Sequence, residues 1–331
     1  MKNIIVLGTW NSGSGAIHEY LASRKDILSP FGFNEFKVCS DPMGLNYLFQ
    51  NCYRTGNTLL NPSHAFEDFI KYIDGFHKYK HYDNTGQEVK ILDKMIVKLS
   101  NEFINKVTEL KYFALPHYAS VTMTRFEKFY MKIMVKLFNK KIKDLKLKKI
   151  IIPKNEKIFL TEAKKFIKKV LEYYSKQKIT NQNIVLNNAA DITDPVTSSQ
   201  YFENRKIIIV TRDPRDIFSS MKQRKSNATP WYDVKSFIKW YKLSFDNQKF
   251  KKKINDKIIL IVRYEKFLKN FENENERICN FLKISKKFKL KKIESKFEIS
   301  KSIKNIGKSR KFLNKKENLL ISKHLKSHLQ W

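Results

Sequence analysis

The first eighteen residues constrain the fold most, because they have the pattern of a buried strand, a small-residue turn and a helix start. The run Ile4–Leu7 is apolar and rich in β-branched side chains, which suits a central parallel strand. Gly8, Gly13 and Gly15 follow it and let the backbone approach a bound group closely. A helix starting at Ala16 would point its free N–H groups and positive dipole end into the turn. The segment therefore predicts an anion cradle, although small residues at such a corner also serve packing alone.

The spacing of Gly8 and Gly13 matches the nucleotide-binding P-loop, G-x-x-x-x-G-K-[ST], but the two residues that carry its chemistry are absent. In that motif the lysine reaches the β- and γ-phosphates and the Ser/Thr hydroxyl binds Mg²⁺. Ser14 and Gly15 occupy these two places here. The loop is thus a poor candidate for ATP or GTP hydrolysis, although its amides can still hold one phosphate. A P-loop nucleotide kinase or NTPase stays as an alternative that Mg²⁺-dependent ATP turnover would favour.

The charge of the chain favours anionic partners. Its 331 residues carry 66 Lys and Arg against 32 Asp and Glu, a net charge of +34. Hydrophobic residues at 42% nevertheless argue for a globular fold, and the length suits one large α/β domain. Lysines spread along the whole chain also fit a compositional bias. No helix-turn-helix, zinc or RNA-binding signature is present, so a basic module for nucleic acid or anionic surfaces is only a third interpretation.

The cysteines and the hydropathy indicate a cytoplasmic protein without metal. Cys39, Cys52 and Cys279 are widely spaced and form no C-x-x-C pair, so free thiols in a reducing compartment are expected. No signal peptide is expected, because the first strand begins almost at Met1. No window approaches 18 uninterrupted apolar residues, so no transmembrane segment is expected either.

Short apolar strands alternate with helices, which predicts a central parallel sheet flanked by helices. The strands are expected at 4–7, 33–38, 183–186, 206–211 and 258–262. Between them, residues 62–180 contain amphipathic basic helices and a lysine-rich loop at 140–154, which predicts a helical insertion within a single domain, 1–331. Another helix is expected to open at Asp41-Pro42. Ligands of such sheets bind at the carboxyl ends of the strands, where the first loop, Arg212 and Arg263 should lie.

Arg212 follows the clearest strand directly, in the stretch IIIVTRDPRDIFSSM. Ser220 comes eight residues later on the next helix, so both can reach one phosphate, Arg212 through a bidentate fork and Ser220 through its hydroxyl. Taken alone, Arg212 is better interpreted as a strand-end arginine paired with Asp213 or Asp216. Beside the first loop, however, this stretch is similar to a known phosphate-binding motif.

The chain resembles the sulfotransferases that use 3′-phosphoadenosine 5′-phosphosulfate (PAPS). The resemblance rests on the first loop, on IIIVTRDPRDIFSSM, on IVRYEKFLKN and on the late segment Lys304–Arg310. It covers both ends of the chain and implies the α/β fold typical of P-loop-containing nucleotide-binding proteins. It also implies transfer of a sulfuryl group to an acceptor hydroxyl, expected to be that of a carbohydrate, with adenosine 3′,5′-bisphosphate (PAP) as product and no metal.

The same resemblance implies roles for individual residues. The first loop would bind the 5′-phosphosulfate through Thr9, Asn11, Ser12, Gly13, Ser14, Gly15 and Ala16. Arg212 and Ser220 would bind the 3′-phosphate, and Gly307, Lys308 and Arg310 would cover the nucleotide. Asn11 departs from the family, which usually places a cation there. His18, Lys37 and the late basic residues are candidates to replace it, and a catalytically impaired PAP- or polyanion-binding protein is an open alternative.

The acceptor hydroxyl needs a general base. Glu35, in FNEFKV, fits the position of the glutamate used by glycan-modifying members and is the first candidate. A surface carboxylate paired with Lys37 is an equally open interpretation of Glu35. His117, in LPHY, is the second candidate. The oligomeric state and the identity of the acceptor do not follow from the sequence.

Overall fold

The computed structural model describes residues 2–55, 60–78, 81–82, 88–89, 92–114, 121, 123–137, 148–176, 182–225, 229–245, 257–291 and 297–330. The chain divides into two compact units. The sheet unit comprises Met1–Asp41 and Ile167–Trp331, and the helical unit comprises Pro42–Phe166. The insertion expected at 62–180 overlaps the helical unit from residue 62 to residue 166.

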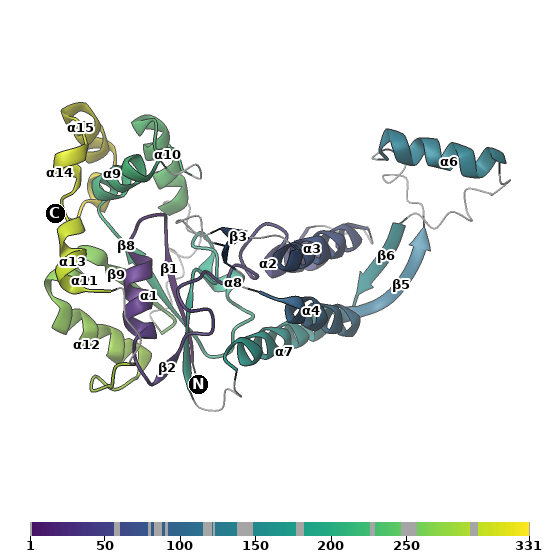
Figure 1. Ribbon diagram of the computed structural model, residues 1–331, viewed down its shortest axis with the longest axis horizontal. Helices are drawn as coiled ribbons and strands as arrows, with labels where there is room; N and C mark the ends of the chain where they lie inside the picture. The colour runs from purple at the N-terminus through teal and green to yellow at the C-terminus, as the bar shows by residue number, and fades with distance from the viewer. Residues whose placement is uncertain are drawn as a thin grey trace. The chain divides into compact units, whose positions relative to one another are not determined.

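The sheet unit contains a five-stranded parallel sheet in the order β2-β7-β1-β8-β9 (Figure 1). The strands are β1 Asn3–Gly8, β2 Ile27–Leu28, β7 Asn183–Asn187, β8 Arg205–Thr211 and β9 Ile259–Arg263. The runs of Ile, Val and Leu in the three inner strands, β7, β1 and β8, are buried, as a central parallel sheet requires. The α/β class with a parallel sheet flanked by helices is confirmed. Because β1, β8 and β9 are neighbours, their carboxyl ends meet at one edge of the sheet.

Two hydrophobic clusters hold helices in this unit. In the first, Ile4 and Val6 of β1 pack with side chains of α1 Ser14–Ala22, α11 Tyr264–Lys269 and α12 Phe271–Leu282. The second cluster joins α9 Pro214–Arg224, α10 Val234–Phe245 and α15 Lys315–His324. The unit also contains residues 167–174 of α7 Glu156–Tyr174. Its short helices are α8 Pro195–Ser198, α13 Ile299–Ser302 and α14 Ser309–Phe312, and it has 3-10 helices at Ile303–Asn305 and Lys326–His328.

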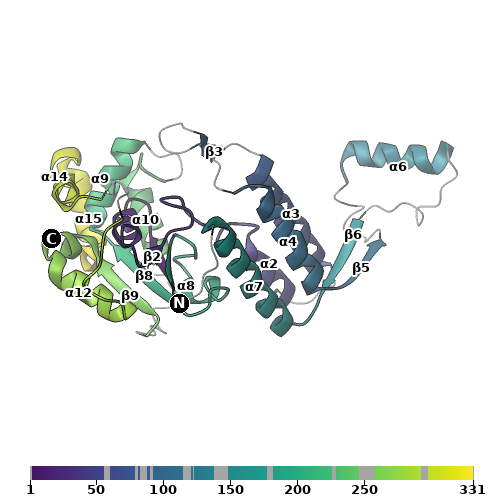
Figure 2. The same ribbon diagram turned by 60° about the horizontal axis from the view of Figure 1, so that its bottom comes forward.

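The helical unit is built mainly from amphipathic helices with an aromatic core. Its helices are α2 Leu45–Tyr53, α3 Asn61–Lys78, α4 Lys94–Val107, α6 Arg125–Leu137 and the first part of α7 Glu156–Tyr174. Figure 2 shows α3 beside both α2 and α4. Phe66, Phe69, Phe103 and Phe159 are buried among them. The unit also has two antiparallel pairs, β5 Thr108–Ala114 with β6 Lys148–Pro153 and β3 His81–Tyr82 with β4 Glu88–Val89.

Three local predictions are wrong. Residues 33–38 form no strand but contribute one parallel bridge, Glu35 to Asn187, after a turn in which Gly32 has a φ of 58°. The helix expected at Asp41-Pro42 begins instead at Leu45, because Met43 has a left-handed φ of 68° that a helix cannot include. In the expected loop 140–154, residues 148–153 form β6, whose β-branched run pairs with β5. Among the described residues no helix has the length and hydropathy of a membrane span.

Candidate functional site

The first loop is held tightly between β1 and α1. Gly13 is the N-cap of α1 and has a left-handed φ of 89°, which favours glycine. A Cβ on Gly13 would lie 2.3 Å from Cδ2 of Tyr264, and one on Gly8 would lie 2.1 Å from Oγ of Ser12. Close packing therefore requires both glycines, and the left-handed backbone is a second reason for glycine at position 13. Between them, the Ser12 N–H donates to the Thr9 carbonyl at 3.0 Å and closes the turn.

The same loop offers polar groups that the described protein atoms leave unused. The hydroxyls Thr9 Oγ1 and Ser12 Oγ are buried and have no hydrogen-bond partner among the described residues. A Cβ on Gly15 would meet no atom within 4 Å, so there is open space beside the first turn of α1. Ser14, Gly15 and Ala16 form this first turn, where the helix dipole favours an anion. The loop thus has the geometry of the predicted anion cradle.

Arg212 connects the first loop to two distant segments. Its side chain is 5% exposed at the end of β8. Nη1 donates to the Asn11 carbonyl at 2.9 Å and to Ser220 Oγ at 3.4 Å, and Nη2 donates to the Asn305 carbonyl at 2.7 Å. A guanidinium has five N–H groups, so these three bonds leave two, one of which is the buried Nε–H without a partner within the described ranges. Arg212, Ser220 and the first loop therefore lie together, as the sequence predicts.

Asp216 places the late loop beside α9. Its buried carboxylate accepts from the Gly307 N–H at 2.7 Å and from the Ser309 N–H at 2.9 Å. Lys308 is thereby held between these two bonds. Arg310 lies on α14, and its N–H donates to the Gly307 carbonyl at 3.1 Å. The predicted late-loop residues thus sit next to the helix that carries Ser220.

Positive charge gathers at this place. Burial lowers the pKa of Lys308, and the positive charges of Arg212 and Arg224 lower it further, against the opposing effect of Asp216. Lys308 is therefore close enough to Arg212 and Arg224 to feel both positive charges. Arg224 was missed by sequence reasoning, although it follows Ser220 by four residues and so shares its face of α9.

The two aspartates that could have paired with Arg212 have other partners. Asp213 caps α9 through the Arg215 N–H and forms an ion pair with the Arg215 guanidinium at 2.8 Å. Its own N–H donates to Glu265 Oε1 at 2.9 Å, and burial raises the pKa of Glu265. The RYE stretch therefore serves to join β9 to the start of α9.

Glu35 is linked to the first loop through one side chain. Asn188 Nδ2 donates to Glu35 Oε1, and Asn188 Oδ1 accepts from the Gly8 N–H at 3.1 Å. The ion pair of Glu35 with Lys37 is also present, with Oε2 and Nζ 3.2 Å apart. Both interpretations of Glu35 thus have a structural counterpart. The second candidate base, His117, lies outside the described residues.

His18 does not replace the charge that Asn11 lacks. Its ring is 1% exposed, and burial lowers its pKa to about 4. His18 is therefore neutral at neutral pH. Asn11 itself has a left-handed φ of 61° and presents its carbonyl to Arg212.

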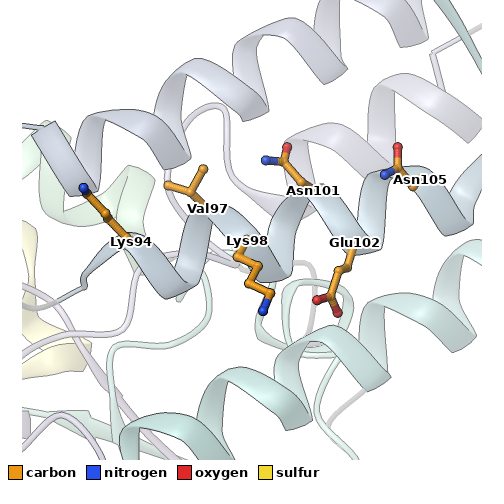
Figure 3. Close-up of a pocket in the computed structure, with 6 residues that line it drawn as sticks. All are labelled: Lys94, Val97, Lys98, Asn101, Glu102 and Asn105. Atoms are coloured by element: carbon orange, nitrogen blue, oxygen red, sulfur yellow. The ribbon is translucent and has the colours of Figure 1, made fainter.

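A separate hollow of about 540 Å³ lies along α4 in the helical unit (Figure 3). It is lined by Lys94, Val97, Lys98, Asn101, Glu102 and Asn105. None of the predicted site residues contributes to it. The groups suited to binding phosphate are those of the sheet unit.

One comparison with known proteins identifies a family. A model of the sulfotransferase family matches residues 3–287. Searching the curated proteins gives no match. Mouse sulfotransferase SULT7A1, solved with PAP, is 17% identical and has a TM-score of 0.32, with 48% of this chain and 70% of that chain covered.

Two further solved structures are similarly distant. The sulfotransferase domain from the curacin biosynthetic pathway is 14% identical, with a TM-score of 0.45 and coverage of 100% of this chain and 98% of its own. Sulfotransferase STF9 from Mycobacterium avium is 12% identical, with a TM-score of 0.38 and coverage of 99% of this chain and 69% of that chain. At this distance the structures transfer no residue roles, and the family match rests on the family model.

Proposed function

Because the chain belongs to the sulfotransferase family, we propose that it transfers the sulfuryl group of PAPS to a hydroxyl group of a carbohydrate. The observation that carries this proposal is the position of Arg212. One guanidinium joins the first loop, Ser220 and the late segment, and it keeps two N–H groups for a ligand. A nucleotide with a 5′-phosphosulfate and a 3′-phosphate would have to contact these three segments.

The residues present fit PAPS by their chemistry. The glycine turn and the buried Thr9 and Ser12 hydroxyls suit the 5′-phosphosulfate, since they offer close backbone approach and unused donors. The Arg212 fork, together with the charge of Lys308 and Arg224, suits the 3′-phosphate. When bound, PAPS supplies the sulfuryl group, and PAP is the leaving group.

Catalysis in this arrangement is positioning and charge stabilisation. Sulfuryl transfer, like phosphoryl transfer, has a loose in-line transition state, so charge builds up on the leaving 5′-phosphate. The loop amides and the Thr9 and Ser12 hydroxyls would stabilise that charge. Glu35 would take the proton of the acceptor hydroxyl as its oxygen bonds to sulfur and the bond from sulfur to the 5′-phosphate oxygen breaks. Every proton and bond is then accounted for without a metal.

Two observations support the finer parts of the proposal, the carbohydrate acceptor and the cytoplasmic location. The place of Glu35, which is similar to that of the glutamate of glycan-modifying members, supports a carbohydrate acceptor. The free thiols of Cys39, Cys52 and Cys279 favour the cytoplasm. His117 is kept as the second candidate base.

A PAP-binding protein with impaired turnover is the second candidate function. It is favoured by Asn11, which has no charge where the family usually has a cation, and by the neutral state of His18. The ATP-dependent alternative is disfavoured, because Ser14 and Gly15 stand where a P-loop has its lysine and its Mg²⁺ ligand.

Calorimetry with PAP tests the proposal. We expect wild type to bind PAP and Arg212→Ala to bind it at least ~10-fold more weakly, since a charged hydrogen bond contributes about 1.5–3 kcal/mol. Arg212→Lys keeps the charge without the fork and should lie between them. Arg277→Ala removes a half-exposed guanidinium from α12, which pairs with Glu274, and is the matched control. Wild type that fails to bind PAP would refute the proposal, and PAP release from PAPS separates an enzyme from a binding protein.

A further inference from the structure

We propose that Asn188 is a positioning residue that fixes the Glu35 carboxylate against the first loop. The inference rests on the proposed function, in which Glu35 is the general base. Asn188 lies in the chain directly after β7, where sequence reasoning assigned no role to any residue. Its side chain bonds to both elements that the reaction would use.

The backbone at Asn188 is already specialised. Its φ of 46° is left-handed, a region that asparagine tolerates better than most residues other than glycine. Its N–H donates to the Val6 carbonyl at 2.9 Å, next to the end of β1. Strained backbone of this kind is retained where a side chain must be aimed in one direction.

The chemistry of the two neighbours fixes the orientation of the Asn188 amide. The Gly8 N–H can only donate, so it requires the oxygen Oδ1, which lies 3.1 Å away. The Glu35 carboxylate can only accept, so it requires the Nδ2 group. One end of the side chain must therefore be an acceptor and the other a donor. Aspartate and leucine have the shape but not this combination.

The other charged group facing Glu35 holds it less precisely. Lys37 lies 3.2 Å from Oε2, but both side chains of this pair are more than a third exposed. An exposed ion pair of a flexible lysine contributes little and does not fix a direction. Among the described residues, Asn188 and Lys37 are the recorded partners of the Glu35 side chain. The amide of Asn188, whose other end is bound to the Gly8 N–H, is therefore the directional contact.

Two substitutions separate the two ends of the amide. Asn188→Asp keeps an acceptor for the Gly8 N–H but places a second carboxylate against Glu35, which favours its protonated form. Asn188→Gly suits the left-handed backbone and removes both contacts without adding charge. Asn183→Asp is the matched control, because it makes the same change on β7 at an asparagine whose Oδ1 accepts from the Lys2 N–H.

The experiment measures PAP release from PAPS between about pH 5 and 8.5, with 4-nitrophenyl β-galactoside or water as acceptor, and PAP affinity by calorimetry. For Asn188→Asp we expect the acid limb of kcat to move up by roughly one pH unit with PAP affinity within about twofold of wild type. For Asn188→Gly we expect kcat to fall about tenfold without an upward shift of the limb. Asn183→Asp should behave like wild type.

The outcomes distinguish this inference from the proposed function. Wild type that neither binds PAP nor releases it from PAPS refutes both. If wild type binds and turns over but the limb is the same in the Asn188→Asp and Asn183→Asp variants, only the role of Asn188 is overturned. The role is also overturned if Asn188→Asp loses PAP affinity tenfold, because Asn188 would then act on the loop and not on Glu35.

Discussion

His18 makes the stability of the sheet unit fall at acidic pH. It lies on α1, one turn beyond the first loop, and is 1% exposed. Burial is the largest cause that lowers its pKa from 6.5 to about 4; the hydrogen bond to the Val185 backbone opposes this, and the positive charge of Lys291 adds to it. The folded chain therefore holds His18 neutral over a range in which the unfolded chain protonates it.

The direction in which stability changes with pH follows from the lowered pKa of His18. Since the pKa is lower in the folded state, the stabilisation is complete above about pH 6.5 and is lost as the pH falls towards 4. A difference of about 2.5 pKa units corresponds to ~3.4 kcal/mol in total. At pH 5 about 2 kcal/mol of this has been lost, because the folded form is still almost unprotonated while most unfolded chains carry the proton.

Urea unfolding at pH 7.5 and at pH 5 measures this loss. His18→Gln retains a side-chain N–H donor but cannot titrate, so wild type should lose about 2 kcal/mol more free energy of unfolding than the variant between the two pH values. His324→Gln, a replacement of an exposed histidine on α15, is the control and should follow wild type. Equal losses in wild type and His18→Gln would refute the reasoning.

Two further predictions concern the stability of the site. Gly13→Ala should destabilise the protein by roughly 2–4 kcal/mol, because φ is 89° and the new Cβ would lie 2.3 Å from the Tyr264 ring, whereas Gly15→Ala has open space and should gain up to about 1 kcal/mol from helix propensity. Thermal unfolding of the two variants checks this, and the opposite order would contradict it. Glu265→Gln should raise Tm by roughly 2 °C at pH 8, because it keeps the acceptor for the Asp213 N–H and removes a buried charge. Burial raises the pKa of Glu265, so wild type loses stability as pH rises and the gain should vanish towards pH 4; a variant less stable than wild type at pH 8 would argue against it.

The parts of the site that could be predicted are those with a local signal. The glycine turn after β1 and the arginine after β8 both follow runs of β-branched residues, and parallel strands bring such ends together. That Arg212 and Ser220 meet also follows from helix geometry. The strand expected at residues 33–38 had a weaker signal, because FNEFKV contains one β-branched residue, and this segment forms a single bridge to β7.

The remaining contacts join residues that are far apart in the sequence and carry no local pattern. Asn188 and Glu35 are 153 positions apart, and Asp216 and Gly307 are 91 apart. Each contact uses a backbone N–H or an amide whose partner is chosen by the fold and not by its neighbours in the chain. Arg224 lies between these two kinds of residue. Helix spacing predicts that it shares a face of α9 with Ser220, but no local pattern predicts that it lies near Lys308.

Because of these long-range contacts, Arg212 would both anchor two segments of the chain and bind a phosphate. A single variant cannot separate these two roles. Its bonds to the Asn11 and Asn305 carbonyls, across 201 and 93 positions, hold the first loop and the late segment to the end of β8. These bonds fix the direction of the two remaining N–H groups of Arg212. A phosphate could therefore bind them with little loss of side-chain freedom. Arg212→Ala removes both the anchor and the fork, while Arg212→Lys loses the fork and can keep only part of the anchor. The affinity of the lysine variant for PAP, compared with its Tm, is therefore the measurement that separates the two: a lost affinity with an unchanged Tm assigns the effect to phosphate binding, and a parallel loss assigns it to the anchoring of the two loops.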